Sequence, residues 1–236
     1  MTSRAQDSND ADAGHHVALI DLHCHTSASF DGIADPAAVV ARAAERGLTH
    51  VVITDHDTLD GALRAVDAAP AGLTVIVGCE VNTREGDLVF AFVGQPLPRD
   101  VSAREAIEAG RAQGALVGIP HPYDTTRRSL LLDPAHEELV RLVDWVEAWN
   151  GRVGRRAAND QAAALARRAG LPGVGVSDAH TLLEVGTVST SMNGDLSTPT
   201  GLRDALRAEP RILGADPELR PGSLARILRV GARRKP

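Results

Sequence analysis

The sequence is short of cysteine, of aromatic residues and of long apolar runs. Its 236 residues include only two cysteines, Cys24 and Cys79, which are too few for a disulfide framework. No apolar stretch approaches the roughly 20 residues that a membrane helix needs, so we expect no membrane partner. Aromatic residues make up 3% of the chain, which leaves almost no material for a surface that stacks nucleic-acid bases.

An excess of positive charge is also lacking. The chain has 25 Lys and Arg against 31 Asp and Glu, a net charge of −6. This balance excludes a basic face spread over the whole chain and predicts no stable complex with nucleic acid, although a local basic patch stays open. The content of 43% hydrophobic and 24% charged residues is typical of a soluble globular protein.

The length is that of one large domain, which we expect at residues 17–214 because this stretch has no internal repeat and no long linker. Residues 1–16 are rich in Asp, Ser and Asn and lack the apolar core of a signal peptide, so we expect a flexible leader and a cytoplasmic location. Residues 215–236 are predicted to form a basic C-terminal segment. Such charge runs are typical of a solvated helix end, with contact to phosphate or nucleic acid as the alternative.

From residue 17 onward, apolar strands alternate with helices. Strands are expected at residues 17–22, 50–54, 73–81, 88–93, 115–119, 143–148 and 174–177. Helices are expected at residues 35–47, 59–69 and 102–114, from about residue 134, and in a long segment that ends at residue 170. Alternation of this kind is typical of parallel βαβ units and predicts an α/β fold.

Histidine and carboxylate residues follow one strand after another. His23 and His25 are two residues apart in the first strand, which puts both imidazoles on one side, where they can share a metal ion. Cys24 must point the other way, and we interpret it as a packing residue. Further groups end later strands, at residues 54–57, 78–80, 120–122 and 177–180. Functional residues of α/β barrels gather at the C-terminal strand ends, so these groups are expected around one cavity.

Taken in order, these motifs resemble those of the polymerase and histidinol phosphatase (PHP) family. The resemblance spans about residues 17–206 and rests on residues 21–26, Asp31-Gly32 and residues 53–58, 78–80, 121–122 and 177–180. It implies a single-domain, distorted (β/α)7 barrel and a metal-dependent phosphoesterase activity. Histidine and carboxylate ligands without thiolate suit Mn, Zn or Fe, and two or three such ions are expected as cofactors.

The resemblance also implies the roles of individual residues. It assigns His23, His25, Glu80 and Asp178 to one ion, Glu80 and His121 to a second, and Asp31, His56 and His180 to a third. A hydroxide that bridges the ions would be the nucleophile, and His23, His25, Glu80, Asp178 and His180 are the predicted catalytic residues. From their positions after strand-end motifs, Arg127 and Arg128 are the first candidates for binding a substrate phosphate, ahead of Arg152 and Arg155.

The second ion is where the sequence departs from the family. Members commonly carry a histidine ligand in the strand after the glutamate, and Phe90 has that place here. The second ion is therefore expected to have only two protein ligands and to bind weakly. The alternative is that Phe90 packs in the barrel and Glu147 or Asp124 completes the site.

Other polar residues near the motifs have less definite interpretations. Glu147 and Asn150 end a strand, and both a functional and a structural role stay open. Asp21, Asp55 and Asp57 are interpreted as hydrogen-bond acceptors that orient the imidazole ligands.

The predicted function is hydrolysis of phosphate esters, with a small phosphorylated molecule or a nucleotide as the substrate. An exonuclease that acts on short oligonucleotides is the runner-up, favoured by the basic C-terminal segment. A non-catalytic regulatory or metal-storage module is the third interpretation, and the complete ligand sets of the first and third ions argue against it.

Overall fold

A computed structural model of the chain describes residues 17–214, so the predicted leader and basic C-terminal segment lie outside the described residues. The strands of this part are β1 (Val17–Cys24), β2 (His50–Ile53), β3 (Thr74–Asn82), β4 (Asp87–Ala91), β5 (Leu116–Ile119), β6 (Trp145–Asn150), β7 (Gly173–Val176), β8 (Ser189–Asn193) and β9 (Arg211–Leu213). The α-helices are α1 (Pro36–Glu45), α2 (Asp60–Asp67), α3 (Ala103–Ala112), α4 (Arg156–Ala169) and α5 (Pro199–Arg207).

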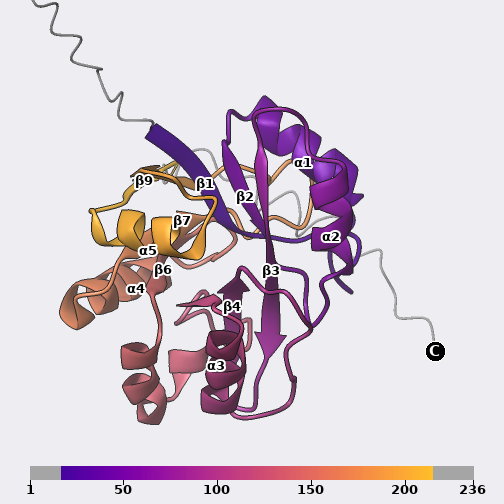
Figure 1. Cartoon of the computed structure of the whole chain (residues 1–236). Helices are drawn as coiled ribbons and strands as arrows, with labels where there is room; N and C mark the ends of the chain where they lie inside the picture. Colours follow the sequence, from indigo (N-terminus) through magenta and orange to yellow (C-terminus); the bar gives the residue numbers. More distant parts are fainter. Residues whose placement is uncertain (1–16, 215–236) are drawn as a thin grey trace, which may run out of the picture.

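The strands between residues 17 and 214 form one sheet in the order β7-β6-β5-β4-β3-β2-β1-β8-β9, with the helices outside it (Figure 1). The sheet curls until its ends nearly meet. Residues 17–20 of β1 pair with β8, whereas Cys24 at the other end of β1 bridges to Ala179 after β7. The Asp178 amide donates to the His23 carbonyl at 2.9 Å, and the His25 amide donates to the Ala179 carbonyl at 2.8 Å. The predicted α/β barrel in a single domain is confirmed.

Local signals explain where the helices begin. Asp35 caps α1 by accepting from the Ala37 amide at 3.0 Å, and Pro36 follows at the first helical position. Ser102 and Glu105 form a capping box at the start of α3. The helix expected from Pro134 is instead a 3-10 segment, Pro134–Leu142, which follows a shorter one at Leu130–Leu132.

The strand directions correct one prediction. The pairs β3–β4 and β4–β5 are antiparallel, where alternation of strands and helices predicted parallel neighbours. The pairs β1–β8 and β8–β9 are antiparallel as well. Only residues 83–86 join β3 to β4, and a parallel crossover needs a dozen or more residues. The elements β8, α5 and β9 were not predicted.

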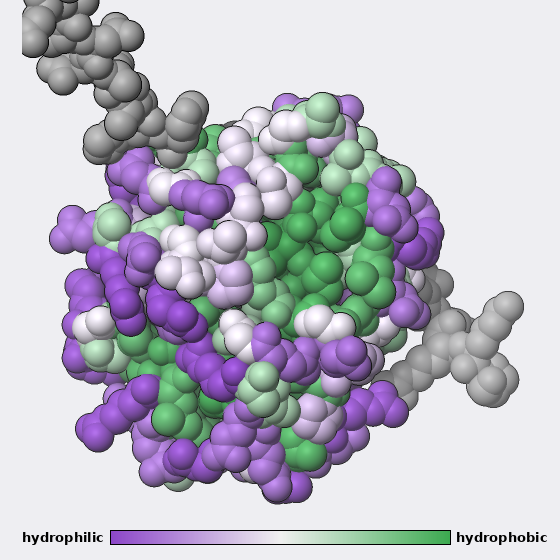
Figure 2. Space-filling model, in the orientation of Figure 1, coloured by the Kyte–Doolittle hydropathy of each residue, from purple (hydrophilic) through white to green (hydrophobic). Residues whose placement is uncertain are grey.

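Hydrophobic side chains gather on the surface beside α2 and β3 (Figure 2), where Leu63 and Val66 of α2 are exposed.

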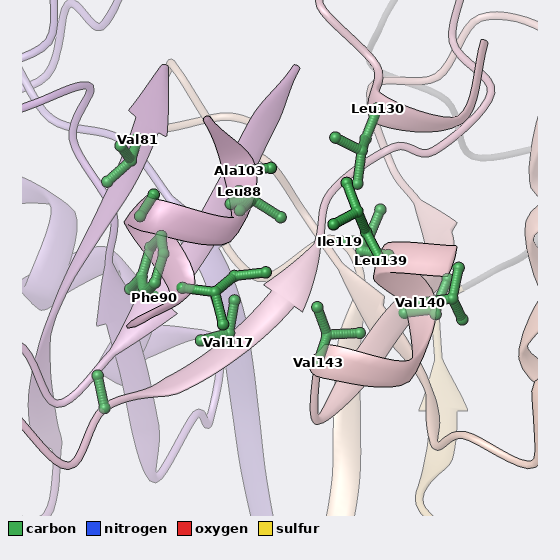
Figure 3. Close-up of a cluster of buried hydrophobic side chains, with 14 of the residues drawn as sticks. Val81, Leu88, Phe90, Ala103, Val117, Ile119, Leu130, Leu139, Val140 and Val143 are labelled. Carbon is green, nitrogen blue, oxygen red and sulfur yellow. The ribbon is translucent and has the colours of Figure 1, made fainter. Parts of the chain in front are cut away.

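Phe90 packs in the core and does not face the predicted metal site. Alternate residues of a strand face opposite sides, and Val89 and Ala91 join the cluster that includes Trp145. Phe90 belongs to the cluster between the sheet and α3 (Figure 3). A Cβ atom added to Gly110 of α3 would lie 2.5 Å from its ring. The expectation that Phe90 stands in a ligand's place is therefore wrong, because its side chain lies on the face of β4 that packs against α3.

Among residues 17–214, no helix combines the length and the apolar character that a membrane crossing requires.

Candidate metal centre

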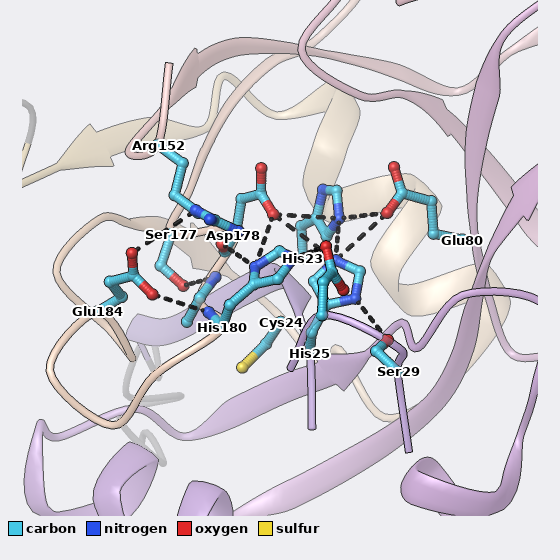
Figure 4. A network of polar contacts seen from close by, with 12 residues as sticks. His23, Cys24, His25, Ser29, Glu80, Arg152, Ser177, Asp178, His180 and Glu184 are labelled. Atoms are coloured by element: carbon cyan, nitrogen blue, oxygen red, sulfur yellow. Dashed lines mark hydrogen bonds and ion pairs between the residues drawn. The ribbon is translucent and has the colours of Figure 1, made fainter. Parts of the chain in front are cut away.

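The structure brings the eight predicted metal-ligand residues to one end of the barrel. They are His23 of β1, His25 and Asp31 after β1, His56 after β2, Glu80 of β3, His121 after β5, and Asp178 and His180 after β7. A cavity of about 240 Å³ opens above them, and Phe30, Asp57, Asn82, Asp87 and three arginines also line it. Figure 4 shows the imidazoles of His23, His25 and His180 between the carboxylates of Asp178 and Glu80.

The first cluster consists of His23, His25 and Asp178, whose ligand atoms lie within 4.8 Å of one another. The Nε2 atoms of the two histidines are 2.8 Å apart, and Asp178 Oδ1 lies 3.7 and 3.6 Å from them. Glu80 Oε2 approaches the same two nitrogens at 3.2 and 3.3 Å. Cys24 points away from the cluster in Figure 4 and is fully buried, in keeping with its packing interpretation.

The second cluster consists of Glu80, Asp87 and His121. Glu80 Oε1 lies 3.1 Å from His121 Nε2, so the two oxygens of Glu80 face different clusters. Asp87 Oδ1 is buried and has no hydrogen-bond partner among the described residues, and Arg128 Nε lies 3.7 Å from it. A buried carboxylate oxygen in this state is costly unless a cation compensates it, so the position suits a metal ion.

Asp87 is the site residue that sequence reasoning missed. Glu147 and Asp124, which were considered for this position, are bound elsewhere, to His23 and to Arg127. The available signal was the two-residue periodicity of β4. Asp87 is the first residue of β4, directly after the turn at residues 83–86, and it shares its face of the strand with Val89 and Ala91.

The third cluster consists of His25, Asp31, His56 and His180. Asp31 Oδ2 lies 2.9 Å from His180 Nε2, and Asp31 Oδ1 lies 3.7 Å from His56 Nε2. His56 also approaches Glu80 through Nδ1, at 3.4 Å. Glu80 therefore stands among all three clusters, which is the arrangement that a bridging carboxylate requires.

The electrostatics of the site keep its carboxylates ionised at the centre. Burial alone raises the pKa of Glu80, but His23 and His121 overcome it and hold that pKa well below its usual range. The pKa of Asp178 is likewise lowered, because Arg127 and His23 outweigh its burial. Asp87 behaves differently, since burial and the nearby charge of Glu80 raise its pKa to about 7.

His25 and His56 have opposite pKa shifts. Burial and the neighbouring His180 lower the pKa of His25 to about 3, so it is a neutral donor. Burial also opposes the charged form of His56, but Asp31 and Glu80 prevail and raise its pKa to about 9. Protons at such positions occupy the place of a cation, and binding of a metal ion would release them.

A second layer of contacts orients the ligand residues. Glu147 Oε1 lies 2.6 Å from His23 Nδ1, and Glu147 Oε2 accepts from the His121 amide at 2.8 Å. The Asn150 amide donates to Glu147 Oε2 at 2.8 Å and to Asp178 Oδ2 at 3.1 Å. The two residues whose role the sequence left open thus contact ligand candidates of both the first and the second cluster.

The interpretation of Asp21, Asp55 and Asp57 as partners of imidazole rings is wrong. Asp21 accepts from the amides of His23 and Ser177, Asp55 from the amide and hydroxyl of Thr26, and Asp57 from the amide of Asn82. These carboxylates therefore fix the loops at the strand ends. Proximity to a histidine in the sequence predicted contact with its ring, but these carboxylates accept hydrogen bonds from backbone amides instead.

Three of the four arginines considered from the sequence line the cavity, namely Arg127, Arg128 and Arg152. Arg127 pairs with Asp124 and approaches Asp178 Oδ2 at 3.2 Å. The Arg128 side chain is 53% exposed and that of Arg152 is 10% exposed. Arg155 precedes α4, is exposed, and is not among the residues that line the cavity.

Two ligand candidates have unusual backbone conformations. His121 has φ 28° and Asp178 has φ 51°, in a region that residues other than glycine seldom adopt. Such strain persists where the surrounding structure fixes it, and it is concentrated at functional sites.

The donor set of imidazoles and carboxylates, with no thiolate, fits two or three divalent ions.

Comparison with known proteins agrees with this geometry. Residues 21–147 match the PHP domain family, and residues 156–209 match the PHP-associated family. An uncharacterized protein of Methanocaldococcus jannaschii is 31% identical over 121 residues, which are 47% of this chain and 71% of that protein. A 5'-3' exoribonuclease of Haemophilus influenzae is 32% identical over 44% of this chain, and the match covers 42% of the exoribonuclease. The chain thus spans less than half of that nuclease.

Solved structures share the fold. A two-domain protein of Bacteroides vulgatus, described as containing a predicted PHP-like metal-dependent phosphoesterase, has a TM-score of 0.72 and 20% identity over 85% of this chain and 66% of its own. A lesion-specific endonuclease of Pyrococcus furiosus has a TM-score of 0.62 and 20% identity over 86% of this chain and 60% of its own.

Proposed function

Because the chain belongs to the PHP family, we propose that it is a metal-dependent hydrolase of phosphate esters of a small molecule or a nucleotide. The observation that carries the proposal is the convergence of three ligand clusters on Glu80, beneath a cavity that arginines line. Bound divalent ions would polarise the phosphoryl oxygens and make water a nucleophile near neutral pH. Mn, Zn and Fe stay the predicted metals, and the cytoplasm stays the predicted location.

The proposed ligand sets follow the clusters. His23, His25, Glu80 and Asp178 would hold the first ion, Glu80, Asp87 and His121 the second, and Asp31, His56 and His180 the third. The second ion then has three protein ligands, which is the usual number for a catalytic site. Glu80 would bridge the ions, and its low pKa keeps it ionised for this role.

Arg127 is the residue best placed to bind the substrate phosphate. Its guanidinium lies in the cavity beside Asp178 and is held by Asp124, so it is already oriented before a substrate enters. Arginine presents a planar fork of donors that suits phosphate oxygens. Arg128, which is more exposed at the same cavity, would bind a second phosphate or a substrate group nearer to the solvent.

The test is phosphate release from ribose 5-phosphate by protein loaded with Mn²⁺, Zn²⁺ or Fe²⁺ in turn. We expect turnover with at least one metal, loss of turnover in EDTA, and loss in Asp178→Asn. Circular dichroism of the variant would show whether its fold is kept. Absence of turnover with all three metals on a panel of phosphorylated metabolites would contradict the proposal and favour a non-catalytic metal-binding module.

Exonuclease activity on short oligonucleotides is the second candidate. The similarity to the exoribonuclease and the exposed Arg128 beside the cavity favour it. A 5'-phosphorylated RNA of about five nucleotides, tested with the same metals, separates the two candidates. Release of mononucleotides supports the exonuclease, whereas release of inorganic phosphate alone supports the monoesterase.

A further inference from the structure

Phe30 is an aromatic residue in an unexpected place. The chain has only three phenylalanines, two tryptophans and one tyrosine. Phe90 and Trp145 are fully buried, whereas Phe30 is 86% exposed and lines the cavity above the ligand clusters. A large apolar ring gains no stability from burial at such a position, so its presence at the cavity calls for another reason.

The ring is already arranged for stacking. Phe30 lies against the His56 imidazole with ring centroids 4.8 Å apart and an interplanar angle of 27°. His56 in turn approaches Glu80 at 3.4 Å, so Phe30 lies one ring away from the central carboxylate of the site. One face of the phenyl ring contacts His56, and the high exposure of the side chain leaves the other face open to a ligand.

Backbone contacts hold the loop that carries Phe30. The Ser27 amide donates to the Ala34 carbonyl at 2.7 Å, and the Ile33 amide donates to the His180 carbonyl at 3.1 Å. Both ends of the loop are thereby fixed relative to the third cluster. A platform that is positioned before binding loses less conformational entropy when a ligand stacks on it.

We propose that Phe30 is the stacking platform for a nucleobase, so that the site accepts a nucleotide in preference to a sugar phosphate. The proposal rests on the proposed function, since it assigns the substrate class of the same site. Aromatic side chains stack on every base because each base has a π face. A single platform suits a mononucleotide or one terminal nucleotide, in keeping with the scarcity of other aromatic residues.

Adenosine 5'-monophosphate and ribose 5-phosphate form the informative pair of probes. They share the ribose and the phosphate ester and differ by the base. We expect Mn²⁺-loaded protein to bind adenosine 5'-monophosphate more tightly than ribose 5-phosphate by calorimetry, and to hydrolyse it with a lower KM. Phe30→Ala should weaken the nucleotide roughly 5- to 30-fold, in the lower part of the range for base stacking, and leave ribose 5-phosphate unchanged. Phe30→Tyr should retain the preference.

Ile33→Ala is the matched control. Ile33 belongs to the same loop and is 72% exposed, but it is not among the residues that line the cavity. This variant should bind both probes as the wild type does.

The outcomes separate the two proposals. Equal affinity of the wild type for both probes, or an equal effect of Phe30→Ala on both, overturns the stacking role; the second result would make Phe30 a support of His56. Preferential binding of the nucleotide that depends on Phe30, without hydrolysis of either probe, keeps the stacking role and contradicts the phosphoesterase. Hydrolysis of both probes without preference for the nucleotide supports the phosphoesterase and contradicts the stacking role.

Discussion

Replacing Asp87 by asparagine removes the charge at the second cluster and keeps the side-chain volume. Asp87 supplies one of the three ligand groups there, with Glu80 and His121. Structural sites with four ligands bind Zn²⁺ with a free energy of about 10–16 kcal/mol, which is about 3 kcal/mol for each ligand. The second ion should therefore bind roughly 100-fold more weakly in Asp87→Asn, because each 1.4 kcal/mol is a factor of ten.

The pH dependence gives the prediction a second measure. Asp87 has a pKa of about 7 without a bound ion, raised by burial and by Glu80, so below pH 7 a proton competes with the metal. Affinity at the second cluster should then fall as the pH falls below 7, by up to about tenfold for each unit. A group whose folded pKa is raised destabilises the metal-free fold as the pH rises toward that value. The increase in Tm on adding Mn²⁺ should therefore grow between pH 5.5 and 7.5.

The assay is titration of metal-free protein with Mn²⁺ by calorimetry, with bound metal counted by elemental analysis after dialysis. Asp57→Asn is the matched control, because Asp57 also lines the cavity but accepts a backbone hydrogen bond from Asn82 and belongs to none of the clusters. We expect one fewer tight ion in Asp87→Asn and no change in Asp57→Asn. The same number and affinity of ions in Asp87→Asn as in wild type would refute the assignment.

Three further predictions follow from the contacts around the site. Glu147→Gln should lower metal affinity or turnover 10- to 100-fold, because the carboxylate that orients His23 is lost; unchanged titrations would show that the contact is dispensable. Asp178→Asn should reduce turnover by orders of magnitude at saturating Mn²⁺ with the circular dichroism spectrum retained, and near wild-type rates would exclude Asp178 as a ligand. Phe90→His should lower the free energy of unfolding, measured by urea denaturation, by about 2–4 kcal/mol, since it puts an imidazole in the apolar cluster against α3. A gain of bound metal would contradict the observed orientation of Phe90.

The ligand residues could be predicted from the sequence because the barrel geometry acts on local patterns. Two histidines with a spacing of two at a strand end have both rings on one side of the strand, and the Nε2 atoms of His23 and His25 indeed lie 2.8 Å apart. The residues at the ends of later strands reach the same cavity for the same reason. The strand ends, more than any pairwise contact, determine the site.

What the sequence did not predict depends on strand direction and long-range partners. The turn at residues 83–86 reverses β4, and this reversal brings Asp87, rather than a residue further along the strand, next to Glu80. The role of Glu147 depends on contacts with His23, 124 residues away, and with His121, 26 residues away. Neither spacing has a local signature. Strands β8 and β9 pair at the edge beside β1, after the last motif, where no metal-ligand pattern marks them.

The pairing of two carboxylates at the second cluster has an electrostatic consequence. Two carboxylates, Glu80 and Asp87, share one buried position, and the pKa of Asp87 is raised by its burial and by repulsion from Glu80. A divalent ion removes that repulsion, whereas a neutral imidazole would have none to remove. The added negative charge also favours hard ions such as Mn²⁺ over softer ones, because carboxylate oxygens are their preferred donors. The second position should therefore be the one at which exchange of Zn²⁺ for Mn²⁺ is easiest, while the histidine-rich first and third positions retain Zn²⁺.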